Sequence, residues 1–174
     1  MVRAIALLSL LCFGCAVKEQ PQWAKTVAAY EVPLPTAGDK ARFVRLLKEQ
    51  AAASGLHVDT ASQNELKTLS EVSPITFSAG VWQGKDDDES IASAMDFKDH
   101  LGRVWLTFPL GKHPQRTAGF RDKLVPLIQR AWPGTASLPI MPNGAIPLVE
   151  DLTPTPTGYV VKPSAAAKYR DTSD

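Results

Sequence analysis

Hydrophobic and polar residues alternate over three stretches in the middle of the chain, and this period of two predicts three strands. Polar runs at 84–90 and 98–102 separate the stretches and predict the turns of an antiparallel meander. The positions predicted to share a strand face are Ile75, Phe77, Ala79 and Val81, then Ile91, Ser93, Met95 and Phe97, then Val104, Leu106, Phe108 and Leu110. One face of this sheet is therefore apolar and needs a cover.

Two stretches with a helical period of 3.6 supply that cover. The first begins at Asp39, a predicted N-cap, and ends near Gly55. The second contains Pro126, which predicts a kink or a later start, and ends at Pro133. A capping-box pattern over 62–65 predicts a short helical segment between them. The apolar stripes consist of Phe43, Leu46, Leu47 and Ala51 in the first helix and Phe120, Leu124, Leu127, Ile128 and Ala131 in the second.

The prolines near both ends of the domain limit which secondary-structure elements can form there. Residues 28–34 alternate as a strand does, but Pro33 and Pro35 cannot donate ladder hydrogen bonds, so an edge strand or a short one is expected. Residues 138–149 predict a proline-rich hairpin or extended pair. Residues 151–174 predict an exposed Pro/Thr-rich tail.

The order of these elements predicts an α+β fold, with a mainly antiparallel sheet and two helices packed on one face. A ferredoxin-like arrangement is one variant of that order. About 160 residues follow the apolar N-terminal segment, which is enough for one domain with a real core and too few for two comfortable ones. We therefore expect a single globular domain over 28–150.

The first residues have the three-part layout of a secretory signal. Arg3 supplies the positive start, an apolar run extends from Ile5 to Phe13, and small Gly14 precedes Cys15. This run is well short of the ~20 residues that a membrane-spanning helix needs. Cleavage is the favoured interpretation, and an uncleaved membrane anchor is the alternative.

Residues 11–15, Leu-Cys-Phe-Gly-Cys, resemble the lipobox of bacterial lipoproteins. The resemblance implies that 1–14 are a signal peptide, that Cys15 is acylated, and that 15–27 form a lipidated N-terminus and tether. Ala16 stands where an aspartate would imply retention in the inner membrane, so the resemblance favours the outer membrane, with the protein facing the periplasm. Ordinary secretory cleavage at the same place is the alternative. No cofactor is expected besides the covalent lipid.

Cysteine and charge content narrow the functional classes. Cys12 and Cys15 are the two cysteines, so cleavage and acylation would leave no thiol for a disulfide, for catalysis or for a metal. Cleavage would also remove Arg3, one of the 19 Lys and Arg residues, and leave them equal to the 18 Asp and Glu residues. A balanced charge argues against nucleic acid as a partner and against a polybasic membrane-binding face.

The candidate catalytic and metal-binding groups have simpler structural explanations. The acidic run 86–89 lacks the ligand spacing of a calcium loop and is typical of a solvated hairpin tip. Asp96, Asp99 and His100 contain the groups of an acid–base cluster, but turn composition accounts for them. The histidines are widely separated, with no metal-binding pair on one helix. We expect no catalytic residue and no metal.

Two groups of residues are candidate binding sites. Lys112, His113 and Arg116 precede the second helix, where positive side chains beside free backbone amides can hold an anion; the alternative is a solvated loop. Trp82 and Trp105 lie on strand faces opposite the apolar rows, and are candidates for a partner-binding surface. For the tryptophans, the alternative is a second small core formed by the tail and the proline-rich segment.

The expected function is that of a membrane-anchored periplasmic lipoprotein, non-enzymatic, that binds a protein partner in the cell envelope. Two versions remain open: an accessory subunit of an envelope or secretion assembly, or an immunity protein against a toxin that acts in the periplasm. One alternative is a small periplasmic enzyme whose catalytic residues the sequence does not identify, favoured if Asp96, Asp99, His100 or His113 converge in a cleft with shifted titration. The other is a lipid- or glycan-binding module, favoured if the basic residues before the second helix converge at its start.

Overall fold

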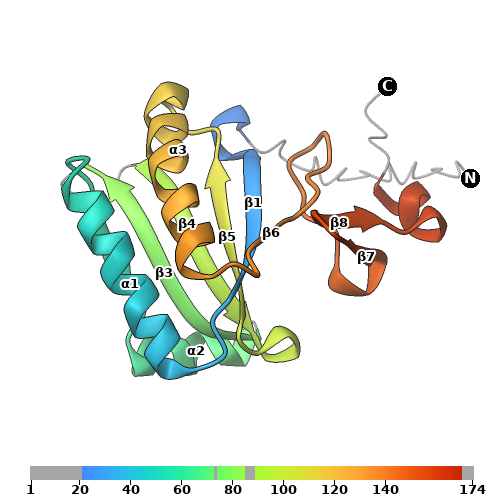
Figure 1. Cartoon of the computed structure of the whole chain (residues 1–174), viewed down its shortest axis with the longest axis horizontal. Helices are drawn as coiled ribbons and strands as arrows, with labels where there is room; N and C mark the ends of the chain where they lie inside the picture. The colour runs from blue at the N-terminus through green and yellow to red at the C-terminus, as the bar shows by residue number, and fades with distance from the viewer. Residues whose placement is uncertain (1–20, 73, 85–88, 170–174) are drawn as a thin grey trace, which may run out of the picture.

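The computed structural model describes residues 21–72, 74–84 and 89–169 of the chain (Figure 1). Its centre is an eight-stranded sheet with the order β2-β3-β4-β5-β1-β6-β8-β7. Among the described pairings, only that of β6 with β8 is parallel. The strands are β1 (Thr26–Pro33), β2 (His57–Thr60), β3 (Ile75–Gln83), β4 (Glu89–Phe97), β5 (Arg103–Pro109), β6 (Ala136–Ser137), β7 (Leu152–Thr155) and β8 (Gly158–Val161). The predicted α+β class with a mainly antiparallel sheet is confirmed.

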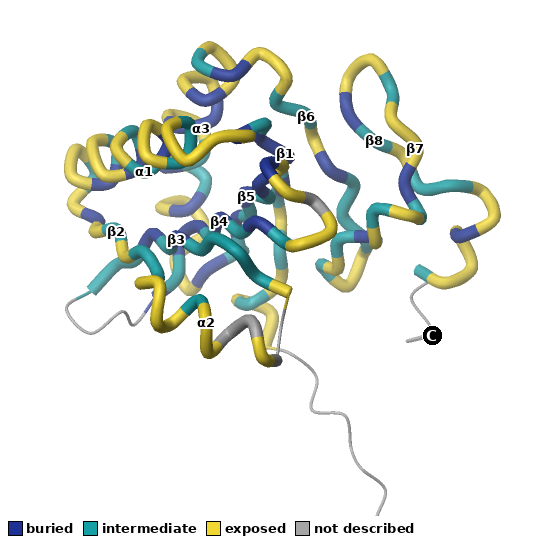
Figure 2. Tube along the Cα trace, turned by 90° about the horizontal axis from the view of Figure 1, so that it is seen from below, coloured by how far each residue is buried: buried dark blue, intermediate teal, exposed yellow. Residues whose placement is uncertain are grey.

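Helices α1 (Ala37–Ala52) and α3 (Pro114–Ala131) cover one face of the sheet, and α2 (Gln63–Val72) lies on the other face (Figure 2). α1 packs on β2 and β3, and α3 packs on β4 and β5, so the predicted placement of two helices on one face is confirmed. The core between them includes Phe43, Leu47, Val81, Ile91, Leu106, Phe108, Phe120, Leu124 and Ile128. Short 3-10 helices are η1 (Gln22–Ala24), η2 (Lys98–His100), η3 (Val149–Asp151) and η4 (Pro163–Tyr169). No helix in the described ranges is long and apolar enough to cross a membrane.

Local side-chain hydrogen bonds fix where α1 and α2 begin. The N-cap of α1 is Thr36, whose hydroxyl oxygen accepts the backbone N–H of Asp39 at 3.0 Å, so the prediction of Asp39 as N-cap is wrong by three residues. The predicted capping box of α2 is confirmed. Ser62 N–H donates to the Glu65 carboxylate at 2.6 Å, and Glu65 N–H donates to the Ser62 hydroxyl at 3.3 Å.

α3 begins at Pro114 and runs through Pro126 to Ala131, so the predicted later start is wrong. A proline at the first helical position costs nothing, because its missing N–H would have no intrahelical partner there. Pro126 removes one hydrogen bond inside the helix. It is exposed, so the carbonyl group that loses its donor lies on the solvent side of the helix.

β1 is a central strand, between β5 and β6, and the predicted edge position is wrong. The positions of the two prolines explain the difference. Pro33 is the last residue of the strand and Pro35 lies beyond it, so neither interrupts the ladder that runs from Thr26.

Residues 152–169, expected to belong to an exposed tail, instead form β7, β8 and η4 (Figure 1). β8 extends the sheet beyond β6 through the parallel pairing of Gly158 with Ser137. A second, smaller core lies here, made of Ala29, Leu138 and Leu152 with Trp105, Ile140, Ile146, Tyr159 and Val161 packed against them. These apolar side chains, scattered among prolines and threonines, give the segment enough burial to fold onto the sheet.

Candidate functional site

The sheet face that carries α2 has small side chains along its middle strands. On β3, strand alternation turns Ala79 and Val81 into the main core and Gly80 towards the opposite face. Gly80 pairs with Ser93 of β4, and Ser93 pairs with Thr107 of β5, so a row of small residues crosses the sheet. Side chains of this size leave space above the strands.

A groove of about 620 Å³ occupies that space, between α2 and the sheet. From α2 come Asn64, Glu65 and Thr68, which one helical turn places on the same side. Asp59 lines it from β2, and Met95 lines it from β4. The volume lies within the ~300–1,000 Å³ that small-molecule and cofactor sites usually have.

Trp82 lies across the floor of this groove, above Gly80. A Cβ atom placed on Gly80 would stand 2.4 Å from the indole Nε1 of Trp82, which is far below any tolerated contact. Glycine at position 80 therefore allows the indole to rest on the strand. Trp82 is half-buried and lines the groove, which is consistent with its predicted place on the face opposite the apolar row.

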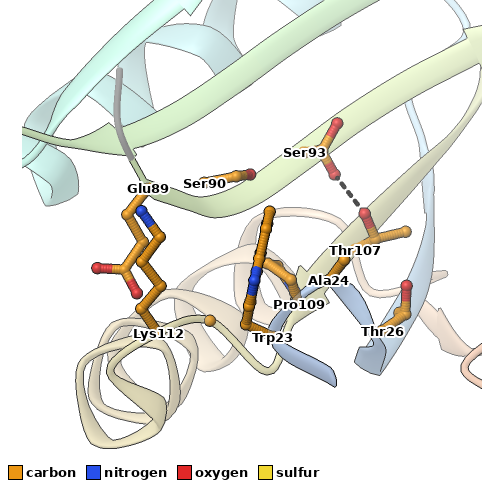
Figure 3. A pocket seen from close by; sticks show the side chains of 10 residues that line it. Trp23, Ala24, Thr26, Glu89, Ser90, Ser93, Thr107, Pro109 and Lys112 are labelled. Atoms are coloured by element: carbon orange, nitrogen blue, oxygen red, sulfur yellow. Dashed lines mark hydrogen bonds between the residues drawn. The ribbon is translucent and has the colours of Figure 1, made fainter. Parts of the chain in front are cut away.

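A smaller recess of about 220 Å³, shown in Figure 3, shares two lining residues with the groove. Trp23 of η1 stands in it, with Lys112 to one side and Thr107 to the other. The carbonyl of Trp23 accepts the N–H of Gly111 at 2.9 Å, which ties η1 to the loop before α3. Ser90 and Ser93 line both hollows, so the two form one lined surface across the sheet.

At the start of α3, two of the predicted basic residues, His113 and Arg116, contact the carboxylate of Glu89. Glu89 accepts the backbone N–H of His113 at 2.9 Å, and its other oxygen lies 2.9 Å from His113 Nδ1 and 3.0 Å from Arg116 Nη1. The backbone of Lys112 also hydrogen-bonds to Glu89, and the Nζ of Lys112 lies 5.9 Å from the centre of the Trp23 ring. An anion predicted to bind at this helix start would therefore meet a site that Glu89 already fills.

The environment of Glu89 sets its ionisation. Burial disfavours the charged carboxylate, but the hydrogen bonds from the ring and backbone of His113, together with the charge of that ring, outweigh burial and hold the pKa of Glu89 below its ordinary value. The side chain of Glu89 is only 5% exposed, so this carboxylate is an internal anchor for the first turn of α3.

Trp105 and Trp82, predicted as one pair, lie in different surroundings. Trp105 packs against the second core and meets the ring of Phe97 edge-on, with ring centroids 5.9 Å apart. The alternative of a second core thus describes Trp105, whereas Trp82 lines the groove. Their expected role in partner binding remains a prediction.

The acid–base candidates do not meet in a common cleft. Asp96 is fully buried, accepting Lys40 Nζ at 2.6 Å and Gly102 N–H at 3.0 Å. Asp99 lies in η2 and is exposed, and neither aspartate lines the groove or the recess. In the part of the chain that the structure describes, no group of three or more His, Cys, Asp and Glu residues is placed to hold a metal.

Several predicted positions lie outside the described residues. These are the proposed lipidation site Cys15 with the signal segment, the acidic residues 86–88 and the side chain of His100. The sequence patterns also missed Asp59 and Glu65 as groove residues. The capping-box pattern placed Glu65 at a helix start, but only the fold shows that this helix crosses the open sheet face.

Comparison with the models of known protein families, with characterised proteins and with solved structures gives no match to this chain.

Proposed function

We propose that this chain is a lipid-anchored, non-enzymatic binding protein of the bacterial cell envelope, and that it holds a protein partner in the groove between α2 and the sheet. The observation that carries the proposal is the groove, whose floor presents Trp82 above a stiff, hydrogen-bonded sheet. Tryptophan is enriched among the residues that contribute most to protein–protein binding, because it buries a large apolar area and still offers a donor.

The polar groups of the groove support binding over catalysis. Asn64, Thr68 and Ser78 are neutral donors and acceptors suited to a partner's backbone. The buried carboxylate of Asp96 serves a different purpose, as the partner of Lys40.

The proposed location at a membrane of the cell envelope comes from the first fifteen residues of the chain. Cys15 is six residues from Pro21, where the described part begins. Six residues reach at most about 20 Å, so a lipid on Cys15 would hold the domain close to the membrane surface. An accessory subunit and an immunity protein would both work there, and the identity of the partner separates the two.

Site-specific photo-crosslinking in the native envelope tests the proposal. A benzophenone amino acid replaces Thr68 or Met95 in the groove of the full chain, and Leu148 or Val160 as controls. Both control side chains are about half exposed and lie outside the groove. We expect one protein adduct from the groove positions, weakened by Trp82→Ala, and none from the controls. Equal adducts at all four positions, or none at the groove positions, would contradict the proposal.

A glycan-binding module is the second candidate, and the recess beside Trp23 is the observation that favours it. An indole beside the hydroxyls of Ser93 and Thr107, with Lys112 at the rim, offers a stacking surface and hydrogen-bonding groups to a sugar ring. Co-sedimentation of the full chain with purified cell-wall glycan tests this candidate. Sedimentation that Trp23→Ala abolishes, together with no groove adduct, would favour it over protein binding.

A further inference from the structure

We propose that the part of the partner held in the groove is an extended peptide segment with a basic side chain, and that Asp59 and Glu65 hold its charge. This inference rests on the proposed function and adds the chemistry of the occupant.

Among the residues that the structure describes, the charged ones that line the groove are both acidic. They are Asp59 of β2 and Glu65 of α2, and none of the described lining residues is a lysine, arginine or histidine. Within the described residues, no ion pair joins either carboxylate to a basic side chain. A ligand in this groove would meet two negative charges without a compensating positive one, so charge complementarity favours a cation.

Local hydrogen bonds hold both carboxylates in place. Asp59 Oδ1 accepts the N–H of Thr60 at 2.8 Å, and Glu65 Oε2 accepts the N–H of Ser62 at 2.6 Å. Each bond uses one carboxylate oxygen. The hydrogen bonds from Ser62 also lower the pKa of Glu65, so this carboxylate is charged at neutral pH. Fixed, charged acceptors bind a cation at a small cost in side-chain entropy.

The floor of the groove suits the stem of a long basic side chain. The indole of Trp82 rests on Gly80, and Met95 lies on the neighbouring strand. Lysine and arginine bury their methylene stems against apolar surface while the charged end reaches a polar partner. A tryptophan face also attracts the cation directly. The carboxylates and the indole therefore favour the same kind of side chain.

The remaining polar groups of the groove indicate that the basic side chain belongs to a peptide. Asn64 and Thr68 line one wall four residues apart on α2, and Ser78 lies on the sheet. An amide and two hydroxyls can donate to and accept from the N–H and C=O groups of an extended backbone. A volume of about 620 Å³ accommodates a short segment of a few residues. A glycan would use the hydroxyls, but it would leave the two carboxylates without a counter-charge.

Selection from a random heptapeptide library tests the inference. The full chain, purified in detergent micelles, is the bait, and the affinities of the enriched peptides are measured by fluorescence anisotropy. The test variant is Asp59→Asn with Glu65→Gln. The new amide oxygens can still accept from Thr60 and Ser62, since glutamine also completes a capping box. The matched control is Glu49→Gln with Glu150→Gln, which removes the same charge from exposed sites outside the groove.

We expect enriched peptides that share one lysine or arginine. The test variant should bind them about tenfold more weakly, with less dependence on salt, whereas the control variant should bind them unchanged. Trp82→Phe keeps a flat ring in place and should weaken binding less than Trp82→Ala. Thermal unfolding of every variant verifies that a loss of binding is not a loss of fold.

Two outcomes overturn the inference and separate it from the proposed function. Peptides that depend on Trp82 but not on the two carboxylates would refute the basic side chain and leave the proposed protein binding standing. A library that yields no binder, together with Trp82-dependent binding of cell-wall glycan fragments, would refute both.

Discussion

Glu89, the first residue of β4, accepts the backbone N–H of His113 at 2.9 Å and, through its other oxygen, lies 2.9 Å from the ring Nδ1 of the same residue. This double contact joins the sheet to the first turn of α3, because His113 is the N-cap of that helix. No side-chain cap of its own is present at His113. Glu89 therefore accepts, from the sheet, the N-cap N–H that the N3 carboxylate accepts within a helix that has a capping box.

Replacement of Glu89 by glutamine should destabilise the protein and change its response to acid. A pKa lowered in the folded state means that the carboxylate stabilises the fold above its ordinary pKa near 4.5, and that this contribution is lost as the pH falls through the folded value. Glu89→Gln should cost roughly 1.5–3 kcal/mol at pH 7, since a charge-assisted hydrogen bond is lost. Urea unfolding from about pH 7 to pH 3 should show a shallower fall in stability than the parent. Glu150→Gln, at an exposed site, is the control, and an identical pH profile for both variants would contradict the assignment.

Gly80→Ala should move the indole of Trp82 without unfolding the sheet. A Cβ at this position would stand 2.4 Å from Nε1, and the flexible end of the tryptophan can turn away more easily than the strand can. The indole N–H resonance of Trp82, assigned with Trp82→Phe, should shift clearly. In Gly119→Ala the new Cβ meets nothing within 4 Å, so the same resonance should stay in place. An unshifted signal in Gly80→Ala would show that the indole does not rest on residue 80.

Lys40→Met should be costly, because it would leave the fully buried carboxylate of Asp96 without its basic partner. Lys40 Nζ lies 2.6 Å from Asp96 Oδ2, and the side chain of Asp96 is 0% exposed. Gly102 N–H would then be the main stabilising group for the carboxylate. A loss of about 2–4 kcal/mol is expected from chemical unfolding, towards the lower end because Lys40 itself is partly exposed. Asp96→Asn with Lys40→Met should recover part of that loss, and additive effects of the two changes would argue against a pair.

The sequence patterns predicted those elements whose burial is decided locally. The strands over 75–110 and the two covering helices form at the predicted positions, because one buried face imposes the period of the apolar residues. The predicted face of β4 is wrong: Ala92 and Ala94 lie in the main core, whereas Ser93 and Met95 line the groove on the opposite face. The capping box at Ser62 was also predictable, since its partners are three residues apart. Thr36 instead of Asp39 as the cap of α1 shows the limit of such signals, because both residues are good caps.

Long-range pairing explains what the patterns missed. β8 joins the sheet through Gly158, and Tyr159 reaches Glu31, which lies 128 residues earlier in the chain. No local period reports a contact of this kind. The candidate site was predictable only in part. Strand alternation placed Trp82 on the face opposite the apolar row. Asp59 and Glu65 line the same groove only because α2 crosses the open face of the sheet, and no local pattern reports that.

Tyr159→Phe should loosen the β7–β8 hairpin and leave the main core intact. The Tyr159 hydroxyl donates to Glu31 Oε1 at 2.7 Å, and Arg103 Nε donates to the same oxygen at 2.8 Å, so the three side chains tie β8 to β1 and β5. Burial, followed by the hydrogen bond and the negative charge of Glu31, raises the pKa of Tyr159 to about 12. The protonated phenol therefore stabilises the fold below its ordinary pKa of 10.0, and this contribution is lost as the pH rises through about 12.

Hydrogen exchange should locate the effect of Tyr159→Phe. The backbone amides of β7 and β8 should exchange faster, those of β3 and β4 should be unchanged, and global stability should fall by about 1–2 kcal/mol. Tyr30→Phe is the control, because no hydrogen bond of its hydroxyl is among those described and its ring packs on Phe108. Equal protection of the hairpin in both variants would mean that the second core alone holds β8 in place. In that case the main role of Glu31 would be its ion pair with Arg103. The hairpin would then be held by the packing of Leu152 and Val161 and not by the Tyr159 hydroxyl.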